Sequence, residues 1–265
     1  MEFVMPTLRE LFSLDGKVAL VTGGAGYLGL AMSEALAELG ARVAIASRNL
    51  EKCQEAAARL GPEHLAPRLD IASADSIRAV VREVIERTGR LDVLVNNAYS
   101  GPVRSIEEAD EHDFEVSLRN GVTAYYVAAK AAWEFMRDHG GGSIINIASM
   151  YGVVASYPDA YTGFDINSPP NYHALKGGLV HLTRHLAAYW AKDGVRVNAI
   201  SPGPFPSPRV KDAMPEFIQR LEAKTPLGRM GLPHELKGVV LLLASDAGSY
   251  ITGQNILVDG GWTIW

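Results

Sequence analysis

The segment NYHALKGG, residues 171–178, places a tyrosine and a lysine four positions apart. If this segment is helical, Tyr172 and Lys176 lie on one face, about 5–6 Å apart at their β-carbons. A free phenol has a pKa of about 10, and a nearby ammonium favours the phenolate and lowers that pKa. Tyr172 could therefore exchange a proton with a reacting group, although the same spacing also occurs in ordinary solvent-exposed helices.

A glycine-rich turn, TGGAGYLG at residues 22–29, follows an apolar run near the start of the chain. Glycines let the backbone turn tightly and approach a pyrophosphate, and the N-terminus of a following helix favours an anion. Gly23 and Gly29 enclose five residues, which is wider than the GxGxxG pattern. The turn predicts a dinucleotide site, provided that a strand precedes it and a helix follows it.

These residues lie within an alternation of β-branched runs and longer helical stretches, which is typical of a parallel sheet covered on both faces. We expect strands at 17–22, 41–46, 64–70, 91–97, 142–149, 195–201 and 254–260. We expect helices near 28–39, 49–59, 74–88, 112–138, 172–192 and 233–244. The pattern predicts an α/β fold, a single Rossmann-like doubly wound domain over residues 1–265 with a seven-stranded parallel sheet.

Composition excludes several classes of function. The chain is 48% hydrophobic and 21% charged, as in ordinary globular proteins, and no stretch approaches the ~20 apolar residues that span a bilayer. A net charge of −5 argues against nucleic-acid binding. The single cysteine, Cys53, cannot form an internal disulfide, and the first residues lack a signal-peptide pattern. We therefore expect a cytoplasmic protein with no nucleic-acid or membrane partner.

Six motifs carry a resemblance to a known family. They are TGGAGYLG (22–29), NNAY (96–99), Ser149, YHALK (172–176), PGP (202–204) and GQNILVDGG (253–261), in this order. Each motif is weak alone, but together they are in register over nearly the whole chain. From about Phe12 to Gly261, the chain resembles the short-chain dehydrogenases/reductases.

The resemblance implies a catalytic set of Ser149, Tyr172 and Lys176. In this family the tyrosine gives a proton to a carbonyl oxygen, or takes one from an alcohol, while a nicotinamide exchanges hydride at the carbon. The lysine and the oxidised nicotinamide lower the pKa of the tyrosine, the lysine also holds the nicotinamide ribose, and the serine hydrogen-bonds the reacting oxygen. The six motifs therefore favour the catalytic interpretation of Tyr172 and Lys176.

The same resemblance predicts where a dinucleotide binds. The expected contacts are Gly23, Tyr27, Leu28, Gly29, Ser47, Arg48, Asp70, Ile71, Asn97, Ala98, Tyr172, Lys176, Pro202, Gly203 and Phe205. At the end of the second strand, Ser47 and Arg48 offer a hydroxyl and a guanidinium, which suit the 2′-phosphate of NADP better than an acid would. We expect NADP, with NAD also possible, because some relatives with such an arginine accept either cofactor.

Three positions depart from the family pattern. Tyr27 replaces the usual middle glycine of the glycine-rich turn, where a tyrosine cannot easily take glycine-only backbone angles. Tyr99 replaces the glycine after NNA, and either walls the substrate pocket or packs against the neighbouring helix. The slot of the family's active-site asparagine falls on Gly121, with Asn120 one residue early. Either a bulge in the helix brings Asn120 to the site, or the water that this asparagine holds is absent.

Two histidines could suggest a metal site. His181 and His185 share a helical face at a spacing that can bind zinc, but no glutamate follows His181 and no third ligand is evident. We assign the two histidines a structural or interface role and expect no metal. The resemblance also implies a homo-oligomer, either a dimer or a tetramer.

An extra loop of about residues 156–170 separates Ser149 from Tyr172, and it leaves the end of the sheet where ligands bind in open α/β folds. Its aromatic and polar side chains include Tyr157, Asp159, Tyr161, Phe164, Asp165 and Asn167. Such a mixture could stack on a sugar ring and accept hydrogen bonds from its hydroxyls. It favours a sugar, polyol or similar compound over a long acyl chain or a strong anion. The loop could instead cover a subunit interface.

The sequence therefore predicts an NADP(H)-dependent oxidoreductase that interconverts a ketone and a secondary alcohol, with Tyr172 as proton donor and acceptor. A 3-oxoacyl thioester reductase and a non-catalytic dinucleotide-binding sensor or scaffold are the alternatives. The joint presence of Ser149, Tyr172 and Lys176 favours an enzyme, because a binding protein has no chemical need for all three. The altered slot at Gly121 keeps the non-catalytic alternative open.

Overall fold

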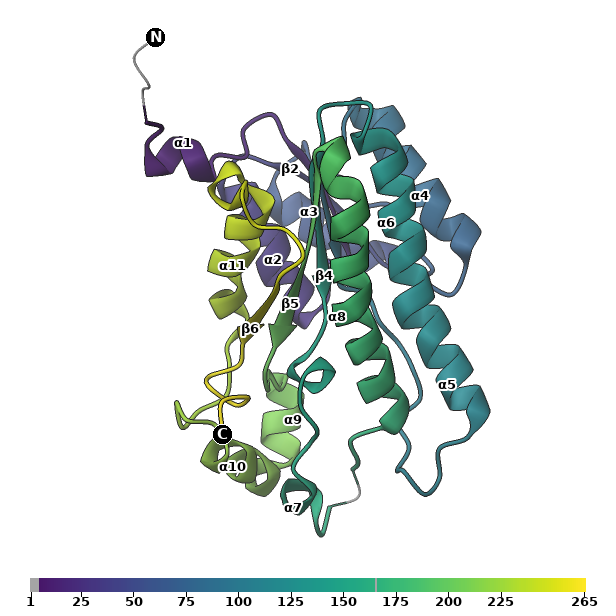
Figure 1. Cartoon of the computed structure of the whole chain (residues 1–265), viewed down its shortest axis with the longest axis vertical. Coiled ribbons are helices and arrows are strands. Elements are labelled where there is room, and N and C mark those ends of the chain that lie inside the picture. Colours follow the sequence, from purple (N-terminus) through teal and green to yellow (C-terminus); the bar gives the residue numbers. More distant parts are fainter. Residues whose placement is uncertain (1–4, 165) are drawn as a thin grey trace.

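The computed structural model describes residues 5–164 and 166–265, and one parallel sheet forms its centre (Figure 1). The strands are β1 (Val18–Thr22), β2 (Arg42–Ala46), β3 (Val93–Asn96), β4 (Gly142–Ile147), β5 (Val195–Pro202) and β6 (Asn255–Val258). They lie in the order β2-β1-β3-β4-β5-β6, and every neighbouring pair is parallel. The predicted α/β Rossmann-like fold with a parallel sheet is confirmed.

Helices cover both faces of this sheet. They are α1 (Leu8–Phe12), α2 (Tyr27–Glu38), α3 (Leu50–Leu60), α4 (Ala74–Thr88), α5 (Glu111–Leu118), α6 (Ala124–Met136), α7 (Pro158–Tyr161), α8 (Pro170–Trp190), α9 (Pro208–Ala213), α10 (Pro215–Ala223) and α11 (Lys237–Ala244). Helices α4, α6 and α8 pack on one face, whereas α2, α3 and α11 pack on the other. Successive residues of a strand point to opposite faces, so Leu20 and Val21 of β1 enter different cores. Cys53 is buried in the second core, as packing predicts.

Local sequence sets the ends of the helices. Helix α4 spans the predicted range 74–88: the Ser73 side chain accepts a hydrogen bond from the amide of Ser76, and Gly89 ends the helix with a left-handed φ of 72°. Helix α8 begins at Pro170, which suits a first helical turn because the N–H that proline lacks would have no partner there. These signals position the helix that carries Tyr172 at the carboxyl end of the sheet.

One of the seven predicted strands, residues 64–70, does not form. This segment runs beside β2 but pairs with it only at isolated points, at Leu65 and at Arg68. Pro67 lies between these points and has no N–H to donate, so a continuous ladder is interrupted. The prediction of seven strands was therefore wrong, and the sheet ends at β2.

Two predicted helices are also interrupted. The helix expected at 112–138 is divided into α5 and α6 by a π-helical turn, Arg119–Thr123. The helix expected at 233–244 starts as a 3₁₀ turn, Pro233–Leu236, and becomes α-helical only in α11.

Within the described residues, no helix is long and apolar enough to cross a bilayer.

Short helices α7, α9 and α10 gather beyond the carboxyl ends of the strands, at the bottom of Figure 1. Helices α7 and α10 contribute to a separate apolar cluster, here called the carboxyl-end cluster. Its buried members are Met150, Ala160, Phe217, Ile218, Leu221, Met230 and Trp262. The sequence did not predict these helices. Because they lie at the end of the sheet where ligands bind in open α/β folds, they form part of the surroundings of the candidate site.

Candidate active site

Ser149 and Tyr172 meet at the carboxyl end of β4. Ser149 is the second residue after the strand, is buried, and begins a 3₁₀ turn by accepting a hydrogen bond from the amide of Tyr151. Tyr172 lies in the first turn of α8, where burial raises the pKa of its phenol and a hydrogen bond with Ser149 offsets part of that rise. The two residues that the sequence assigned to the reacting oxygen therefore face one another.

Lys176 lies one turn further along α8 and is only 4% exposed. Its Nζ donates to the carbonyl of Ile147 at 2.7 Å and lies 5.5–5.9 Å from the ring centroids of Tyr99, Tyr125 and Tyr172. Among the described residues, no ion pair includes Lys176. Burial without a carboxylate lowers the pKa of Lys176 to about 7.

In the protein alone, the pKa of the Tyr172 phenol is raised, whereas the sequence argument expects a lowered pKa when Lys176 and an oxidised nicotinamide act together. Its pKa is raised, chiefly because the group is buried. The hydrogen bond with Ser149 lowers the pKa by a smaller amount, and the neighbouring phenols of Tyr99 and Tyr161 raise it further. The sequence argument gave Lys176 and the oxidised nicotinamide together the task of lowering this pKa. In the protein alone Lys176 cannot do so fully, because burial suppresses its own charge.

The buried Lys176 predicts a pH dependence of stability. Between pH 7 and 9 the unfolded chain holds the Lys176 proton more tightly than the folded one, because the folded pKa is about 7 and the ordinary value is 10.5. The free energy of unfolding should therefore rise over this range, by about 2 kcal/mol from this group. Well below pH 7 Lys176 is protonated in both states, so its penalty is complete and constant there.

Urea unfolding at pH 7 and pH 9, without cofactor, measures this effect. Lys176→Met retains a side chain of similar length without a charge, so its rise in stability should be smaller by about 2 kcal/mol. Equal pH dependence in the original protein and in this variant would show that Lys176 does not lose its proton near neutral pH.

A cleft of about 260 Å³ lies at the carboxyl ends of β1, β2 and β3. Its lining comprises Gly23, Gly26, Ser47, Arg48, Leu69, Ile71, Asn97, Ala98, Tyr99 and Ser100. Six of the predicted cofactor contacts, Gly23, Ser47, Arg48, Ile71, Asn97 and Ala98, are thus brought together. Segments from three different strand ends line one cavity, as a dinucleotide site requires.

The glycine-rich turn fits the phosphates of a dinucleotide. Gly23 has a φ of 66°, and a Cβ at Gly29 would lie 2.2 Å from the carbonyl oxygen of Gly23, so both positions require glycine. Gly26 precedes α2 and provides no side-chain cap, so the first amides of the helix remain available. Uncapped amides at a helix N-terminus favour an anion such as a pyrophosphate.

Tyr27, the substitution in this turn, is tolerated. It is the first residue of α2, and no non-glycine residue among those described has a positive φ, so Tyr27 takes ordinary helical angles. Its side chain is partly exposed, and that of Leu28 packs against the core of the sheet. Neither residue lines the cleft, although both lie at its helix N-terminus.

Ser47 and Arg48 differ in their availability to a ligand. The Ser47 hydroxyl donates to the carbonyl of Asn49 and lies 2.9 Å from the sulfur of Cys53, so it faces α3. Arg48 is exposed, lines the cleft, and has no ion-pair partner within the described part of the chain. Of the two residues, Arg48 therefore has the free group.

Four other predicted cofactor residues lie outside the cleft. Asp70 is exposed, and its Oδ1 accepts a hydrogen bond from the amide of Ala72. Pro202 ends β5, the amide of Gly203 donates to a carbonyl of β6, and Phe205 packs over the α2 and α11 face. The structure places the last three at the carboxyl end of β5.

A second pocket of about 260 Å³ adjoins the catalytic residues. Its lining comprises Tyr99, Pro102, Val103, Tyr151, Tyr161, Asn167, Ser168, Pro169 and Tyr172. No charged side chain is among these residues. Tyr151 was not predicted, although it follows Ser149 by two positions; its hydroxyl lies 2.9 Å from that of Tyr161. Tyr99 lines both this pocket and the dinucleotide cleft. Of the two alternatives for Tyr99, a pocket wall or packing against the neighbouring helix, this position favours the pocket wall.

The extra loop contributes fewer side chains to this pocket than predicted. Tyr161 and Asn167 line it, but Tyr157 packs edge-on against Trp262 and Phe164 packs against Phe217. Asp159 pairs with Lys224 at 2.7 Å, outside the pocket. Asp165 lies outside the described residues. The loop therefore reaches the site, while most of its aromatic side chains hold it to the carboxyl-end cluster.

The π-helical turn between α5 and α6 is the predicted bulge. It contains Asn120, which is buried and donates from Nδ2 to the carbonyl of Ser100 at 2.9 Å. A Cβ at Gly121 would lie 2.9 Å from the Leu175 side chain, so the turn packs closely against the catalytic helix. The bulge directs the Asn120 side chain to the loop after β3.

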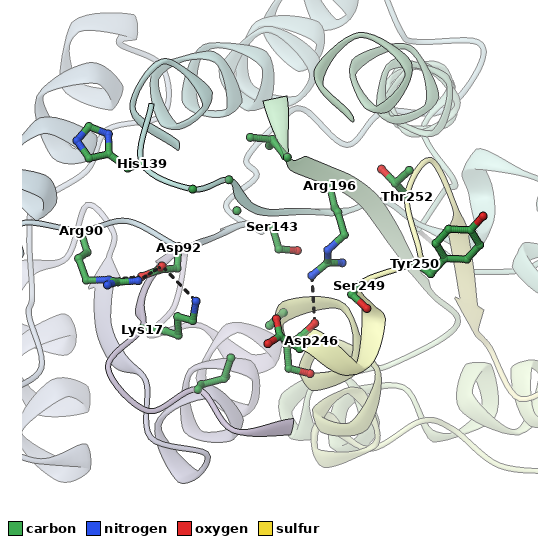
Figure 2. Close-up of a pocket in the computed structure, with 18 of the residues that line it drawn as sticks. Lys17, Arg90, Asp92, His139, Ser143, Arg196, Asp246, Ser249, Tyr250 and Thr252 are labelled. Atoms are coloured by element: carbon green, nitrogen blue, oxygen red, sulfur yellow. Dashed lines mark hydrogen bonds and ion pairs between the residues drawn. The ribbon is translucent and has the colours of Figure 1, made fainter. Parts of the chain in front are cut away.

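A larger cavity of about 530 Å³ lies at the amino ends of β4 and β5, opposite the catalytic residues (Figure 2). Arg90 and Lys17 both pair with Asp92 there, at 2.6 and 3.7 Å. Arg196 donates to two backbone carbonyls at the end of α11, those of Leu243 and Ser245. These cations are engaged within the protein. The described residues contain no group of three or more metal-ligating side chains here or elsewhere.

Comparisons with known proteins agree with this geometry. Residues 24–263 match the family model described as "Enoyl-(Acyl carrier protein) reductase". The chain is 36% identical over 265 residues to the D-threitol dehydrogenase of Mycolicibacterium smegmatis, which covers 96% of this chain and 95% of that protein. A short-chain type dehydrogenase/reductase from Mycobacterium marinum has a TM-score of 0.89 and 35% identity, with 97% and 99% of the two chains covered. A gluconate 5-dehydrogenase from Burkholderia cenocepacia, in complex with NADP and tartrate, has a TM-score of 0.87 and 32% identity, with 98% and 100% covered.

Proposed function

Because this chain belongs to the short-chain dehydrogenase/reductase family, we propose that it interconverts a ketone and a secondary alcohol with NADP(H) and that Tyr172 transfers the proton. One observation carries the proposal. Ser149, Tyr172 and Lys176 converge where the dinucleotide cleft adjoins the tyrosine-lined pocket. A binding protein would need the cleft but not this convergence.

The residues have separate roles in this reaction. A bound nicotinamide would supply or accept the hydride. Tyr172 would give its phenolic proton to the carbonyl oxygen, and Ser149, which hydrogen-bonds Tyr172, would orient the same oxygen. Lys176 would stabilise the resulting phenolate when its ammonium is protonated. The surrounding tyrosine rings exclude water and keep these groups in fixed positions.

NADP is the proposed cofactor because Arg48 is exposed and has no ion-pair partner within the described residues where the end of β2 lines the cleft. A guanidinium binds a phosphate through paired, charge-assisted hydrogen bonds. The related gluconate 5-dehydrogenase was solved with NADP. NAD remains an alternative, although no acid in the cleft lining would bond its ribose 2′-hydroxyl.

The substrate pocket favours a small, neutral, hydroxyl-rich compound. Its tyrosine, serine and asparagine side chains can donate and accept hydrogen bonds, and no cation is present in the lining to bind a carboxylate. The name of the D-threitol dehydrogenase relative also points to a polyol. We therefore propose a polyol and its ketose as the substrate pair.

A substrate panel with NADPH tests this proposal. Short neutral ketoses should have a kcat/KM on the order of 10-fold or more above that of ketoaldonates of the same chain length, because the pocket lining lacks a carboxylate partner. The panel also includes a 3-oxoacyl thioester, the substrate class of the alternative reductase. Faster reduction of the thioester or the ketoaldonate would reject the polyol assignment. NADPH binding without any turnover would favour a sensor or scaffold.

We also propose a homo-oligomer. Leu118, Tyr126 and Tyr189 are exposed on α5, α6 and α8, helices that lie on one side of the molecule (Figure 1). Large exposed apolar side chains on neighbouring helices are typical of subunit contacts. His185, next to Tyr189 on this surface, then takes the predicted interface role.

A further inference from the structure

Tyr99 occupies the boundary between the dinucleotide cleft and the substrate pocket, and it lines both. Its ring centroid lies 5.6 Å from that of Tyr172 and 5.7 Å from the Nζ of Lys176. The Tyr99 ring therefore lies beside both Tyr172, the proposed proton donor, and Lys176. A ring at this distance from an ammonium attracts it through the negative face of the π system.

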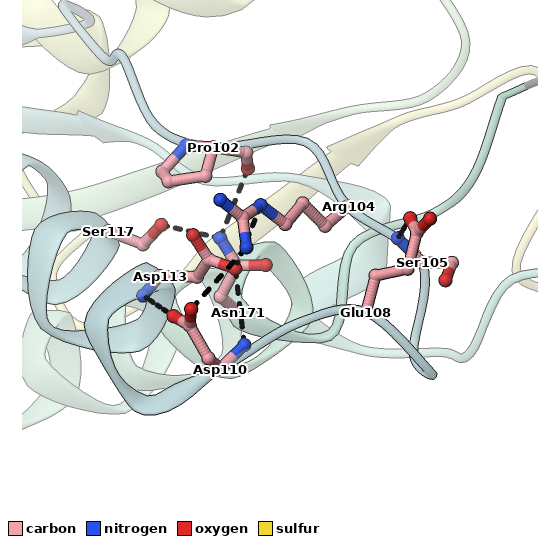
Figure 3. A network of polar contacts seen from close by, with 8 residues as sticks. All are labelled: Pro102, Arg104, Ser105, Glu108, Asp110, Asp113, Ser117 and Asn171. Carbon is pink, nitrogen blue, oxygen red and sulfur yellow. Dashed lines mark hydrogen bonds and ion pairs between the residues drawn. The ribbon is translucent and has the colours of Figure 1, made fainter.

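Buried polar groups hold Tyr99 in this position. Its hydroxyl donates to Ser117 Oγ at 3.2 Å. Asn171 Nδ2 donates to the same Ser117 oxygen at 2.6 Å and to the carbonyl of Pro102 at 3.2 Å (Figure 3). Ser117 and Asn171 are almost completely buried, and Asn171 directly precedes Tyr172. The hydrogen bonds thus connect the loop after β3, helix α5 and the start of the catalytic helix.

The local backbone leaves room for the Tyr99 hydroxyl. A Cβ at Gly101 would lie 2.1 Å from Tyr99 Oη, so another residue at this position would displace the phenol. The same loop is attached to α5 by Arg104, whose Nε lies 3.6 Å from the buried carboxylate of Asp113 (Figure 3). Two residues of α5 therefore fix this loop: Ser117 binds the Tyr99 hydroxyl, and Asp113 pairs with Arg104.

The groups around Lys176 come from four elements. The carbonyl of Ile147 lies at the end of β4, and the rings of Tyr99, Tyr125 and Tyr172 belong to the loop after β3, to α6 and to α8. Within the described residues, no carboxylate pairs with Lys176. The protonated amine is therefore stabilised by one carbonyl and by aromatic faces.

We propose that Tyr99 is a positioning residue for the reaction: held by Ser117 and Asn171, its ring favours the protonated form of Lys176 and keeps this side chain beside Tyr172. This role rests on the proposed function, because it matters only if Tyr172 transfers a proton. The ring and the hydroxyl have different tasks. The ring stabilises the charge, and the hydroxyl fixes the ring.

Tyr99→Leu and Tyr99→Phe separate these tasks. Leucine keeps the site dry but removes the aromatic face, so kcat for ketose reduction should fall about 10-fold. The alkaline limb of kcat/KM, which reports the loss of the Lys176 proton, should move to lower pH by roughly 0.5–1 unit. Phenylalanine keeps the face, so the limb should stay in place and kcat should fall less than about three-fold.

Tyr250→Leu is the matched control, because Tyr250 is a fully exposed tyrosine outside both cavities. Its kcat and pH profile should equal those of the original protein. Tyr99→Met replaces Tyr99→Leu if the latter does not fold, and Ser117→Ala should reproduce Tyr99→Phe.

Three outcomes would overturn the inference: an unchanged alkaline limb in the variant without a ring, an equal shift in Tyr99→Phe, or unchanged kcat in all Tyr99 variants. If Tyr172→Phe abolishes turnover while these results occur, only the role of Tyr99 is rejected. If Tyr172→Phe retains turnover, the proposed function itself is rejected.

Discussion

Replacing Tyr172 with phenylalanine is expected to lower turnover by about 10²-fold or more while NADPH binding stays nearly unchanged. The variant loses only the hydroxyl that would transfer the proton, and it retains the ring that packs beside Tyr99. Because Ser149 and Lys176 remain, the substrate can still bind, so the loss should appear in kcat rather than in KM. Steady-state rates with a ketose and fluorescence titration with NADPH measure the two quantities separately.

The matched control is Tyr250→Phe, which removes the hydroxyl of a fully exposed tyrosine outside both cavities and should leave kcat unchanged. Turnover near the original rate in Tyr172→Phe would mean that another group transfers the proton. Loss of NADPH affinity together with kcat would instead indicate damage to the cleft.

Arg48→Asp should have the second largest effect, on the choice of cofactor. Arg48 is exposed in the cleft lining, so aspartate would place a negative charge where the 2′-phosphate of NADPH is expected. NADPH should bind on the order of 10²-fold more weakly, whereas NADH, which has no such phosphate, should change by less than about five-fold. The ratio of the two dissociation constants, measured by fluorescence titration, is the result of interest.

Arg82→Asp makes the same change in net charge at an exposed position of α4, and it should alter neither constant appreciably. Parallel losses of NADPH and NADH in Arg48→Asp would show that Arg48 does not recognise the phosphate. A smaller effect at high salt is expected, because the attraction between exposed charges is screened.

The parallel sheet could be predicted from sequence because its strands are buried on both faces and are therefore rich in β-branched residues. The prediction failed at residues 64–70, where the composition suits a strand but Pro67 interrupts the ladder. It also missed α10, whose apolar residues Phe217, Ile218 and Leu221 pack against the carboxyl-end cluster instead of the sheet. Such an element depends on a partner that is distant in sequence.

The candidate site was predictable to a similar extent. The order of the motifs predicted Ser149, Tyr172 and Lys176 as the catalytic set, together with six of the ten residues that line the cleft. The directions of side chains were not predictable, since Ser47 faces Cys53 and Tyr157 faces Trp262. These directions depend on packing between segments, which spacing along the chain does not encode.

The carboxyl-end cluster has a consequence for how this enzyme could acquire new specificities. Its buried side chains form a small core of their own, apart from the two cores that stabilise the sheet. The partly buried Tyr151 and Tyr161 pack against this small core and also line the substrate pocket. Substitutions within the cluster can therefore reshape the pocket wall while the sheet and the dinucleotide cleft keep their packing. Substrate preference can therefore change, in nature or by directed evolution, through substitutions in the carboxyl-end cluster alone.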